Sequence, residues 1–143
     1  MRYQNVAVST VLLGLLVSSG AAAQDHSDEA QIRRVLQAYV EGWKAGDAER
    51  LGEVLAPNGT VMWTSETDGV ETLQTMTFAA IIERGRSQRV YELTSVVSLD
   101  IVDETLAVAK VDIERAGGSY IDYLVLYKLG EEWRIVNKAF VVR

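Results

Sequence analysis

The sequence predicts an α+β fold in which helices pack on one face of an antiparallel sheet. Apolar residues between positions 28 and 45 recur at the 3.6-residue spacing of a helix. Residues 90 to 142 instead form four extended runs separated by turn residues. Helices followed by consecutive strands are typical of α+β folds, because sequential strands pair as a meander and the helices cover one of its faces. The 143 residues are enough for one such domain.

The first helix is expected to begin at Asp28, where Gln31 three residues on completes a capping pattern. Gly46 ends it, because glycine readily adopts the left-handed conformation that terminates helices. Apolar side chains at helical spacing define one face of this helix, namely Ile32, Val35, Leu36, Tyr39 and Trp43. That face is expected to pack on the sheet.

A second, short helix is expected from Asp47, and Pro57 prevents it from continuing. Residues 60–64 then alternate as a strand, and Asp68-Gly69 is a tight-turn dipeptide before a second short run. Helical spacing returns at Phe78, Ile81 and Ile82, and Gly85 closes that third helix. The four long strands that follow are expected at residues 91–102, 105–115, 119–129 and 133–142.

The register of these strands suggests a site. Two-residue turns at Asp103-Glu104 and Gly130-Glu131, with a short loop at Gly117, place Asp112 opposite Asp122. One face of the sheet would then be apolar at one end and polar toward the other, where it carries Lys110, Asp112, Tyr120, Asp122 and Asn137. An apolar floor that ends in converging polar groups is typical of a small-molecule pocket.

The Asp112 and Asp122 pair has two interpretations. Buried carboxylates that face each other would share a proton and act as acid or base near neutral pH, with Tyr120 as a hydrogen-bond donor. At a solvated sheet edge, the same pair would only need Lys110 as a surface partner. The pattern leaves both interpretations open.

The aromatic residues also have two interpretations. Tyr39, Trp43 and Trp63 would either form the walls of a cavity or belong to an ordinary core. Tyr123 and Tyr127 alternate on the other face of the sheet, which is unusually apolar for a solvated surface. That face would either pack on the helices or form a dimer surface.

Residues 1–23 are expected to be a cleaved secretory signal, which leaves residues 24–143 as one domain. Arg2 gives a positive start, residues 6–17 are mostly apolar, and Ala21-Ala22-Ala23 supplies the small residues that a signal peptidase reads. A membrane-spanning helix needs about 20 apolar residues, so no membrane anchor is expected after cleavage. A periplasmic or secreted location follows from this interpretation.

Composition argues against several function classes. The chain has 14 basic and 20 acidic residues without a basic stripe, which argues against nucleic acid as a partner. It has no Cys and one His, which argues against most zinc, haem and thiol chemistry. No metal and no cofactor are therefore expected.

Several segments resemble the nuclear-transport-factor-2-like superfamily, in the subgroup described as putative lumazine-binding. The first two helices carry the resemblance through AQIRRVLQAYVEGW at 30–43 and GDAERL at 46–51, and the strands through AVAKV at 107–111, DYL at 122–124 and WRIVNK at 133–138. The resemblance implies that residues 24–143 form a cone, with three helices against a strongly curved antiparallel sheet that is open over a pocket. It also implies a homodimer through the sheet's outer surface.

The resemblance leaves three functions open. The leading hypothesis is an exported, non-catalytic domain that binds a small molecule, with Tyr39, Trp43 and Trp63 as walls and Lys110, Asp122 and Asn137 orienting a polar group. Relatives include ketosteroid isomerases and polyketide cyclases, which use pocket carboxylates as bases, so the alternative is an enzyme with Asp122 or Asp112 as general base. A third possibility is a dimeric interaction module without a ligand.

Overall fold

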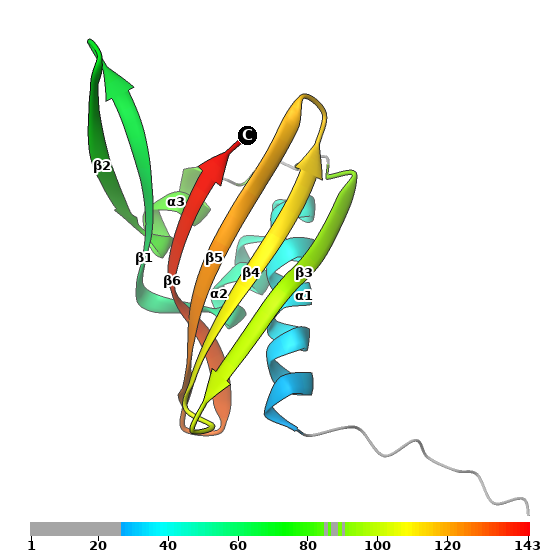
Figure 1. Cartoon of the computed structure of the whole chain (residues 1–143). Coiled ribbons are helices and arrows are strands. Elements are labelled where there is room, and N and C mark those ends of the chain that lie inside the picture. Colours follow the sequence, from blue (N-terminus) through cyan, green and yellow to red (C-terminus); the bar gives the residue numbers. More distant parts are fainter. Residues whose placement is uncertain (1–26, 85, 87–88, 90) are drawn as a thin grey trace, which may run out of the picture.

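The computed structural model describes residues 27–84, 86, 89 and 91–143. The expected signal at 1–23 and the glycine expected to close the third helix, Gly85, lie outside these residues. The elements are α1 (Asp28–Ala45), α2 (Ala48–Val54), β1 (Leu55–Thr67), β2 (Val70–Thr77), α3 (Phe78–Arg84), β3 (Leu93–Val102), β4 (Leu106–Arg115), β5 (Gly118–Leu129) and β6 (Glu132–Val142). The three helices lie on one face of a curved sheet (Figure 1), which confirms the predicted α+β fold.

The six strands form one sheet in the order β2-β1-β6-β5-β4-β3. Neighbouring strands are antiparallel except for β1 and β6, which are parallel. The parallel pair arises because the chain leaves β2 through α3 to the far edge of the sheet, and its last strand returns to the centre beside β1. The β1–β2 hairpin projects beyond the rest of the sheet (Figure 1), where its tip has no helix behind it.

Local chemistry sets the ends of the first two helices. The Ser27 hydroxyl accepts a hydrogen bond from the backbone N–H of Ala30 at 3.3 Å, so Ser27, one residue before the expected Asp28, caps α1. Gly46 ends α1 in the left-handed conformation, with φ of 66°, as predicted. Asp47 caps α2 by accepting a hydrogen bond from the backbone N–H of Arg50.

The core lies between α1 and the concave face of the sheet. The predicted apolar face of α1 is buried at four of its five positions, and Val35 is partly buried against the same core. The central strands supply the opposite side with small and branched residues, which are Ala107, Ala109, Val111, Ile113, Leu124, Leu126 and Ile135. This packing fixes which face of each strand points toward the helices.

The predicted register of β4 was wrong by one residue. Three residues, not two, separate the paired Val102 and Leu106, because Asp103 and Glu104 both adopt positive φ and Thr105 completes the turn. On the other side of β4, Arg115 pairs with Gly118 across the turn at Gly117, and this register places Asp112 opposite Ile121 and Asp122 opposite Val111. A one-residue slip exchanges the two faces of a strand, so β4 turns the side chains at 110 and 112 away from the helices.

A β-bulge changes the face of β6 halfway along the strand. Leu126 pairs with Ile135, but Val125 pairs with Asn137, so Val136 is an extra residue. Side chains before the bulge keep the predicted face, whereas after it the inward positions shift by one residue. Lys138, opposite Leu124, consequently points inward in place of the predicted Asn137.

Candidate functional site

Three polar side chains meet beneath the sheet at one buried point. The Tyr39 hydroxyl donates a hydrogen bond to Oδ2 of Asp122 at 2.8 Å. Lys138 Nζ donates to the same Oδ2 and to the Tyr39 hydroxyl oxygen, each at 2.8 Å. Among the described residues, Asp122 is the one charged side chain with no exposed surface. A charge that deep is stable because the ammonium and the phenol both face it.

Each member of this cluster comes from a different element. Tyr39 lies on the buried face of α1, one turn before Trp43. Asp122 lies on the inward side of β5, two residues before the core residue Leu124. Lys138 reaches the cluster from β6 because of the bulge at Val136, and its ammonium packs 4.7 Å from the ring centroid of Phe140. The contacts therefore depend on both the helix face and the strand register.

Burial and charge shift two ionisation equilibria in opposite directions. Burial lowers the pKa of Lys138, and the negative charge of Asp122 and its hydrogen bond counteract part of that effect. Burial also raises the pKa of Tyr39 well above its ordinary value, and the adjacent Asp122 raises it further. The phenol is therefore held neutral, and the lysine loses its proton more easily than a lysine in water.

A cavity of about 280 Å³ opens beside this cluster. It lies between the helices and the sheet, and its lining comes from α1, α3, the segment before β3, and strands β4 to β6. The lining residues are Trp43, Ile81, Arg89, Tyr91, Ile113, Tyr120, Asp122, Lys138, Phe140 and Val142. Asp122 is one of these residues, and its Oδ1 is buried without a hydrogen-bond partner among the described residues. A buried carboxylate oxygen without a partner calls for an explanation, and a bound ligand is one.

Cations pack on two of the aromatic walls. The Arg89 guanidinium lies 4.9 Å from the ring centroid of Trp43, and Arg115 lies 4.7 Å from that of Tyr120. Tyr120 in turn meets Phe140 edge to face at 6.0 Å. These contacts orient the rings that line the cavity.

The structure brings together four of the residues that the sequence analysis selected. Trp43, Tyr120 and Asp122 line the cavity, and Tyr39 lies behind Asp122 and holds its Oδ2. Trp63 does not reach the cavity, because it stacks on Phe140 with ring centroids 6.0 Å apart and lines a hollow on the other side of that ring.

The other three candidates lie elsewhere, which corrects the predicted constellation. Lys110 and Asp112 are on the opposite face of β4, where Lys110 Nζ sits 5.9 Å from the Tyr123 ring centroid. Asn137 precedes Lys138 beyond the bulge and donates to Thr60 Oγ1 at 2.9 Å on the neighbouring strand β1. The predicted facing pair of carboxylates is therefore wrong, and a lysine takes the place of the second aspartate.

Sequence reasoning missed Lys138, Phe140, Arg89 and Tyr91. One signal for the first two was present in β6. Large apolar residues occupy positions 133 and 135, and then positions 140 and 142, so the alternation changes phase between them. A change of phase within one strand indicates a bulge. Arg89 and Tyr91 precede β3 in a stretch without periodicity, which offers no comparable signal.

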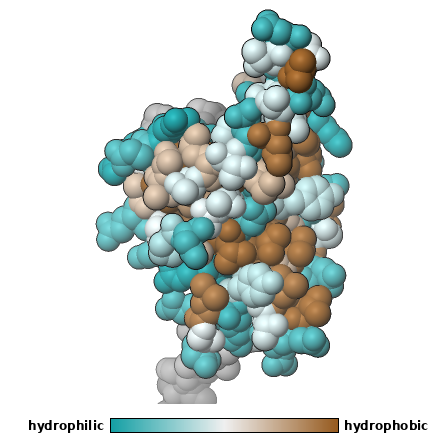
Figure 2. All heavy atoms as spheres, turned by 90° about the vertical axis from the view of Figure 1, so that its left-hand side faces the viewer, coloured by the Kyte–Doolittle hydropathy of each residue, from teal (hydrophilic) through white to brown (hydrophobic). Residues whose placement is uncertain are grey.

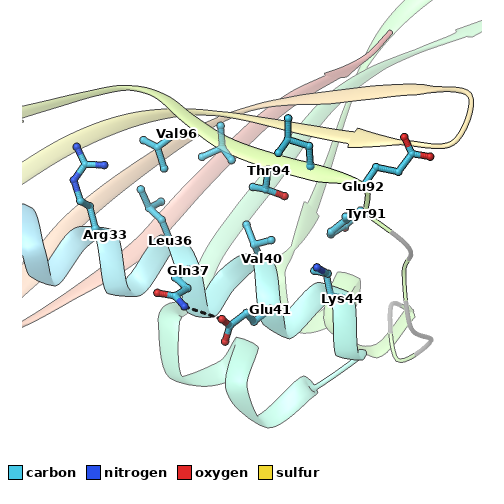
Figure 3. Close-up of a pocket in the computed structure, with 12 residues that line it drawn as sticks. Arg33, Leu36, Gln37, Val40, Glu41, Lys44, Tyr91, Glu92, Thr94 and Val96 are labelled. Atoms are coloured by element: carbon cyan, nitrogen blue, oxygen red, sulfur yellow. Dashed lines mark hydrogen bonds between the residues drawn. The ribbon is translucent and has the colours of Figure 1, made fainter.

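A larger groove of about 400 Å³ lies between α1 and the edge strand β3 (Figure 3). Leu36, Val40 and Val96 form its apolar floor, while Gln37 and Glu41 on its rim hydrogen-bond to each other. The charged side chains along it are exposed or half-buried. Because a polar group buried at the cavity wall is the stronger indication of a ligand site, the Asp122 cavity is the better candidate.

Within the described residues, no cluster of His, Asp and Glu side chains is arranged to hold a metal ion. No helix in this part of the chain is long and apolar enough to cross a membrane.

The fold is shared with solved structures of low sequence identity. NTF2-like proteins of unknown function from Methylobacillus flagellatus KT and Shewanella baltica OS155 superpose with a TM-score of 0.68 each, at 22% and 21% identity. The alignments cover 81% of this chain, and 92% and 94% of theirs. An NTF-2-like protein from Silicibacter pomeroyi DSS-3 gives a TM-score of 0.66 at 18% identity, over 80% of this chain and 95% of the other. No relative was found among curated proteins.

The family described as "Putative lumazine-binding" matches residues 27–141, which include all nine helices and strands apart from the last residue of β6. The match agrees with the fold of the solved relatives and with the resemblance in the first two helices and the central strands. The chain therefore belongs to this family and has the NTF2-like fold.

Proposed function

We propose that this domain binds a small, mainly apolar molecule in the cavity around Asp122. The observation that carries the proposal is Asp122, which lines the cavity and whose buried Oδ1 has no hydrogen-bond partner among the described residues. Leaving a buried acceptor unpaired costs about 1–3 kcal/mol, and a ligand N–H or O–H would remove that cost.

The cluster presents an acceptor and a donor side by side. Lys138 uses two of its ammonium hydrogens on Asp122 and Tyr39, which leaves one for the ligand. The rings of Trp43, Tyr120 and Phe140 favour a planar apolar body. The volume of about 280 Å³ restricts that body to a small molecule.

The test begins with mass spectrometry of whatever co-purifies with the protein, followed by titration of that compound or of a panel of planar heteroaromatic molecules. Asp122→Asn keeps the shape of the site but replaces a charged acceptor, so we expect about a tenfold or greater loss of affinity. Lys138→Met is expected to lose a similar amount.

The other face of the sheet offers matched controls. Asp112→Asn and Lys110→Met make the same chemical changes away from the cavity, and we expect ligand affinity to stay within about twofold of the wild type, because neither side chain lines it. Equal losses in both pairs of variants would contradict the proposal, as would the absence of any bound compound across the panel.

Catalysis by a pocket carboxylate remains a prediction. Of the two candidate bases, only Asp122 lines the cavity, so such an enzyme would depend on this residue without Asp112. Single-turnover assays on any ligand identified above would test it, with Asp122→Asn expected to abolish turnover while some binding remains.

We propose further that the domain is exported, to the periplasm or out of the cell. The proposal is supported by the sequence of residues 1–23, with its positive start, apolar run and small-residue exit. Expression of the full chain in a Gram-negative bacterium followed by intact-mass measurement tests it. The periplasmic fraction should contain a product that starts at residue 24, and an uncleaved cytoplasmic product would refute the proposal.

We also propose that two copies pair through the outer face of the sheet. Tyr123, Tyr127 and Val108 expose 49%, 44% and 38% of their surface there, although all three are large and apolar or aromatic. The adjoining side of the molecule, seen from the β1–β2 hairpin, also carries apolar side chains below the projecting hairpin (Figure 2). Tyr127→Glu should convert a dimer to a monomer in sedimentation analysis, whereas Leu73→Glu on the hairpin should not. A monomeric wild type would refute the proposal.

A further inference from the structure

Lys138 differs in its surroundings from the other lysines of the chain. There are four, at positions 44, 110, 128 and 138. Lys44 is exposed, and Lys128 pairs with Asp28 with 23% of its side chain exposed. The Lys138 side chain is 14% exposed, and its amine is at the wall of a cavity, between a buried carboxylate and aromatic rings. An amine in that position can meet a bound molecule directly.

The groups around Lys138 favour release of its proton. Burial lowers its pKa, and the positive charge of Arg89 lowers it further, while Asp122 acts in the opposite direction. The titratable and charged groups that face the cavity or the amine are Tyr39 from α1, Arg89 and Tyr91 from the segment before β3, and Tyr120 and Asp122 from β5. A desolvated lysine of this kind is the usual source of a nucleophilic neutral amine.

We propose that Lys138 forms a reversible imine with a small aldehyde or ketone bound in the cavity. This inference rests on the proposed function, because the carbonyl compound must first occupy the Asp122 cavity. The walls are mainly apolar and aromatic, so the compound is an aromatic or aliphatic carbonyl compound of limited size.

The condensation needs no oxidant or reductant. The Nζ lone pair of the neutral amine attacks the carbonyl carbon, which forms the C–N bond and moves the C=O π electrons to oxygen. One proton then passes from nitrogen through Oδ1 of Asp122 to that oxygen, which gives the carbinolamine. A second proton follows the same route, so the oxygen leaves as water when the C–O bond breaks and the nitrogen electron pair forms the C=N bond. Oδ1 suits this transfer because it has no other partner among the described residues, whereas Oδ2 is already bonded to Tyr39 and Lys138.

Reductive trapping tests this inference in the full chain. The protein is incubated with benzaldehyde at neutral pH, the imine is reduced with sodium cyanoborohydride, and benzylated peptides are quantified by mass spectrometry. We expect Lys138 to be labelled several-fold faster than Lys44, because its amine borders the cavity that holds the aldehyde and its lowered pKa raises the neutral fraction. The comparison is made within the wild-type chain, so it does not depend on a variant that folds.

Variants then separate reaction from binding. Asp122→Asn should slow labelling of Lys138 at least about tenfold, because the proton carrier is lost. Lys110→Met should leave labelling of Lys138 unchanged, since Lys110 lies on the other face of the sheet. Binding is measured separately by NMR with benzyl alcohol, which has the same ring and no carbonyl.

The two proposals fail differently. If benzyl alcohol shifts the resonances of Ile113 and Tyr120 but Lys138 is labelled no faster than Lys44, the imine is refuted and small-molecule binding stands. If benzaldehyde and benzyl alcohol neither bind nor label, the imine proposal is refuted, and the heteroaromatic panel described above decides the binding proposal by itself.

Discussion

Lys138 reaches Asp122 diagonally across β5 and β6, with 2.8 Å between Nζ and Oδ2, because Val136 is an extra residue in β6. Lys138 is directly opposite Leu124, and Asp122 is directly opposite Phe140, so all four side chains share the concave face. The bulge therefore does more than bend the strand. It selects which residues of its second half enter the site.

This ion pair should dominate the stability of the site. Replacing one partner, in Asp122→Leu or Lys138→Met, leaves the other charge buried and should lower the free energy of unfolding by about 3–5 kcal/mol. The double variant should lose much less than the sum of the two single losses, because no charge remains unpaired. Urea denaturation of the four proteins measures this coupling. Additive losses would show that the two charges are independent.

Local patterns were sufficient to predict the helical half of the site. The 3.6-residue spacing identified the buried face of α1, including Tyr39 and Trp43, because amphipathic periodicity depends on the helix alone. Asp122 was assigned to the correct face of β5 because Leu124 and Leu126 alternate with it in a strand without bulges in that stretch.

The strand partners of Asp122 could not be predicted in the same way. The turn at Gly117, which pairs Arg115 with Gly118, sets β4 one residue away from the expected register against β5 and so exchanges its faces, and one additional residue at Val136 exchanges those of the second half of β6. Both registers depend on how neighbouring strands pair, and of the two only the bulge left a signal in the sequence, the change of phase within β6. Lys110, which lies on the other face, was consequently expected at the site where Lys138 lies.

Tyr39→Phe tests the phenol as a support for Asp122. Losing a hydrogen bond to a buried carboxylate should cost about 1.5–3 kcal/mol at neutral pH. In the wild type, the unfolded chain loses the phenol proton near pH 10.0 while the folded chain keeps it, because the pKa of Tyr39 is raised. The free energy of unfolding should therefore fall as the pH rises above 10.0.

Comparison with Tyr39→Phe isolates this effect from Lys138, whose lowered pKa acts in the opposite direction. The difference between the two proteins should shrink as the pH rises through the alkaline range, as followed by chemical denaturation. A constant difference from neutral pH to the most alkaline conditions tolerated would show that Tyr39 ionises as readily when folded.

Asp28→Asn tests a second anchor, at the other end of α1. Lys128 Nζ and Trp133 Nε1 both donate to Oδ1 of Asp28, at 2.9 and 2.8 Å, and these bonds lower the pKa of the carboxyl group. The stabilisation is present at pH values above 3.8, the ordinary pKa of an aspartate. It is lost as the pH falls below 3.8 and through the lowered pKa of Asp28 in the folded protein. The variant should be less stable than the wild type at pH 7, and the gap should narrow in acid.

Glu29→Gln is the control for Asp28→Asn. Glu29 is also in the first turn of α1, but its ion pair with Arg33 is more than half exposed. Exposed ion pairs contribute little to stability, so the free energy of unfolding of Glu29→Gln should equal that of the wild type across the acidic pH range. If the free energies of unfolding of the wild type and of Asp28→Asn change in parallel with pH, the proposed role of Asp28 as an anchor of α1 is refuted.

Gly59→Ala should weaken both the fold and the site. A Cβ at position 59 would lie 2.5 Å from two ring carbons of Phe78 and 2.7 Å from the carbonyl oxygen of Val136, the bulge residue. The ring and the backbone must both shift, which should cost about 1–3 kcal/mol. Because Val136 sets the position of Lys138, ligand affinity should fall as well.

Gly52→Ala in α2 is the control for Gly59→Ala. A Cβ at position 52 would meet no atom within 4 Å, so this variant should instead stabilise the protein by about 0.5–1 kcal/mol without changing ligand affinity. Urea denaturation and ligand titration of both variants provide the comparison, and equal effects at the two glycines would show that β1 does not hold the bulge in place.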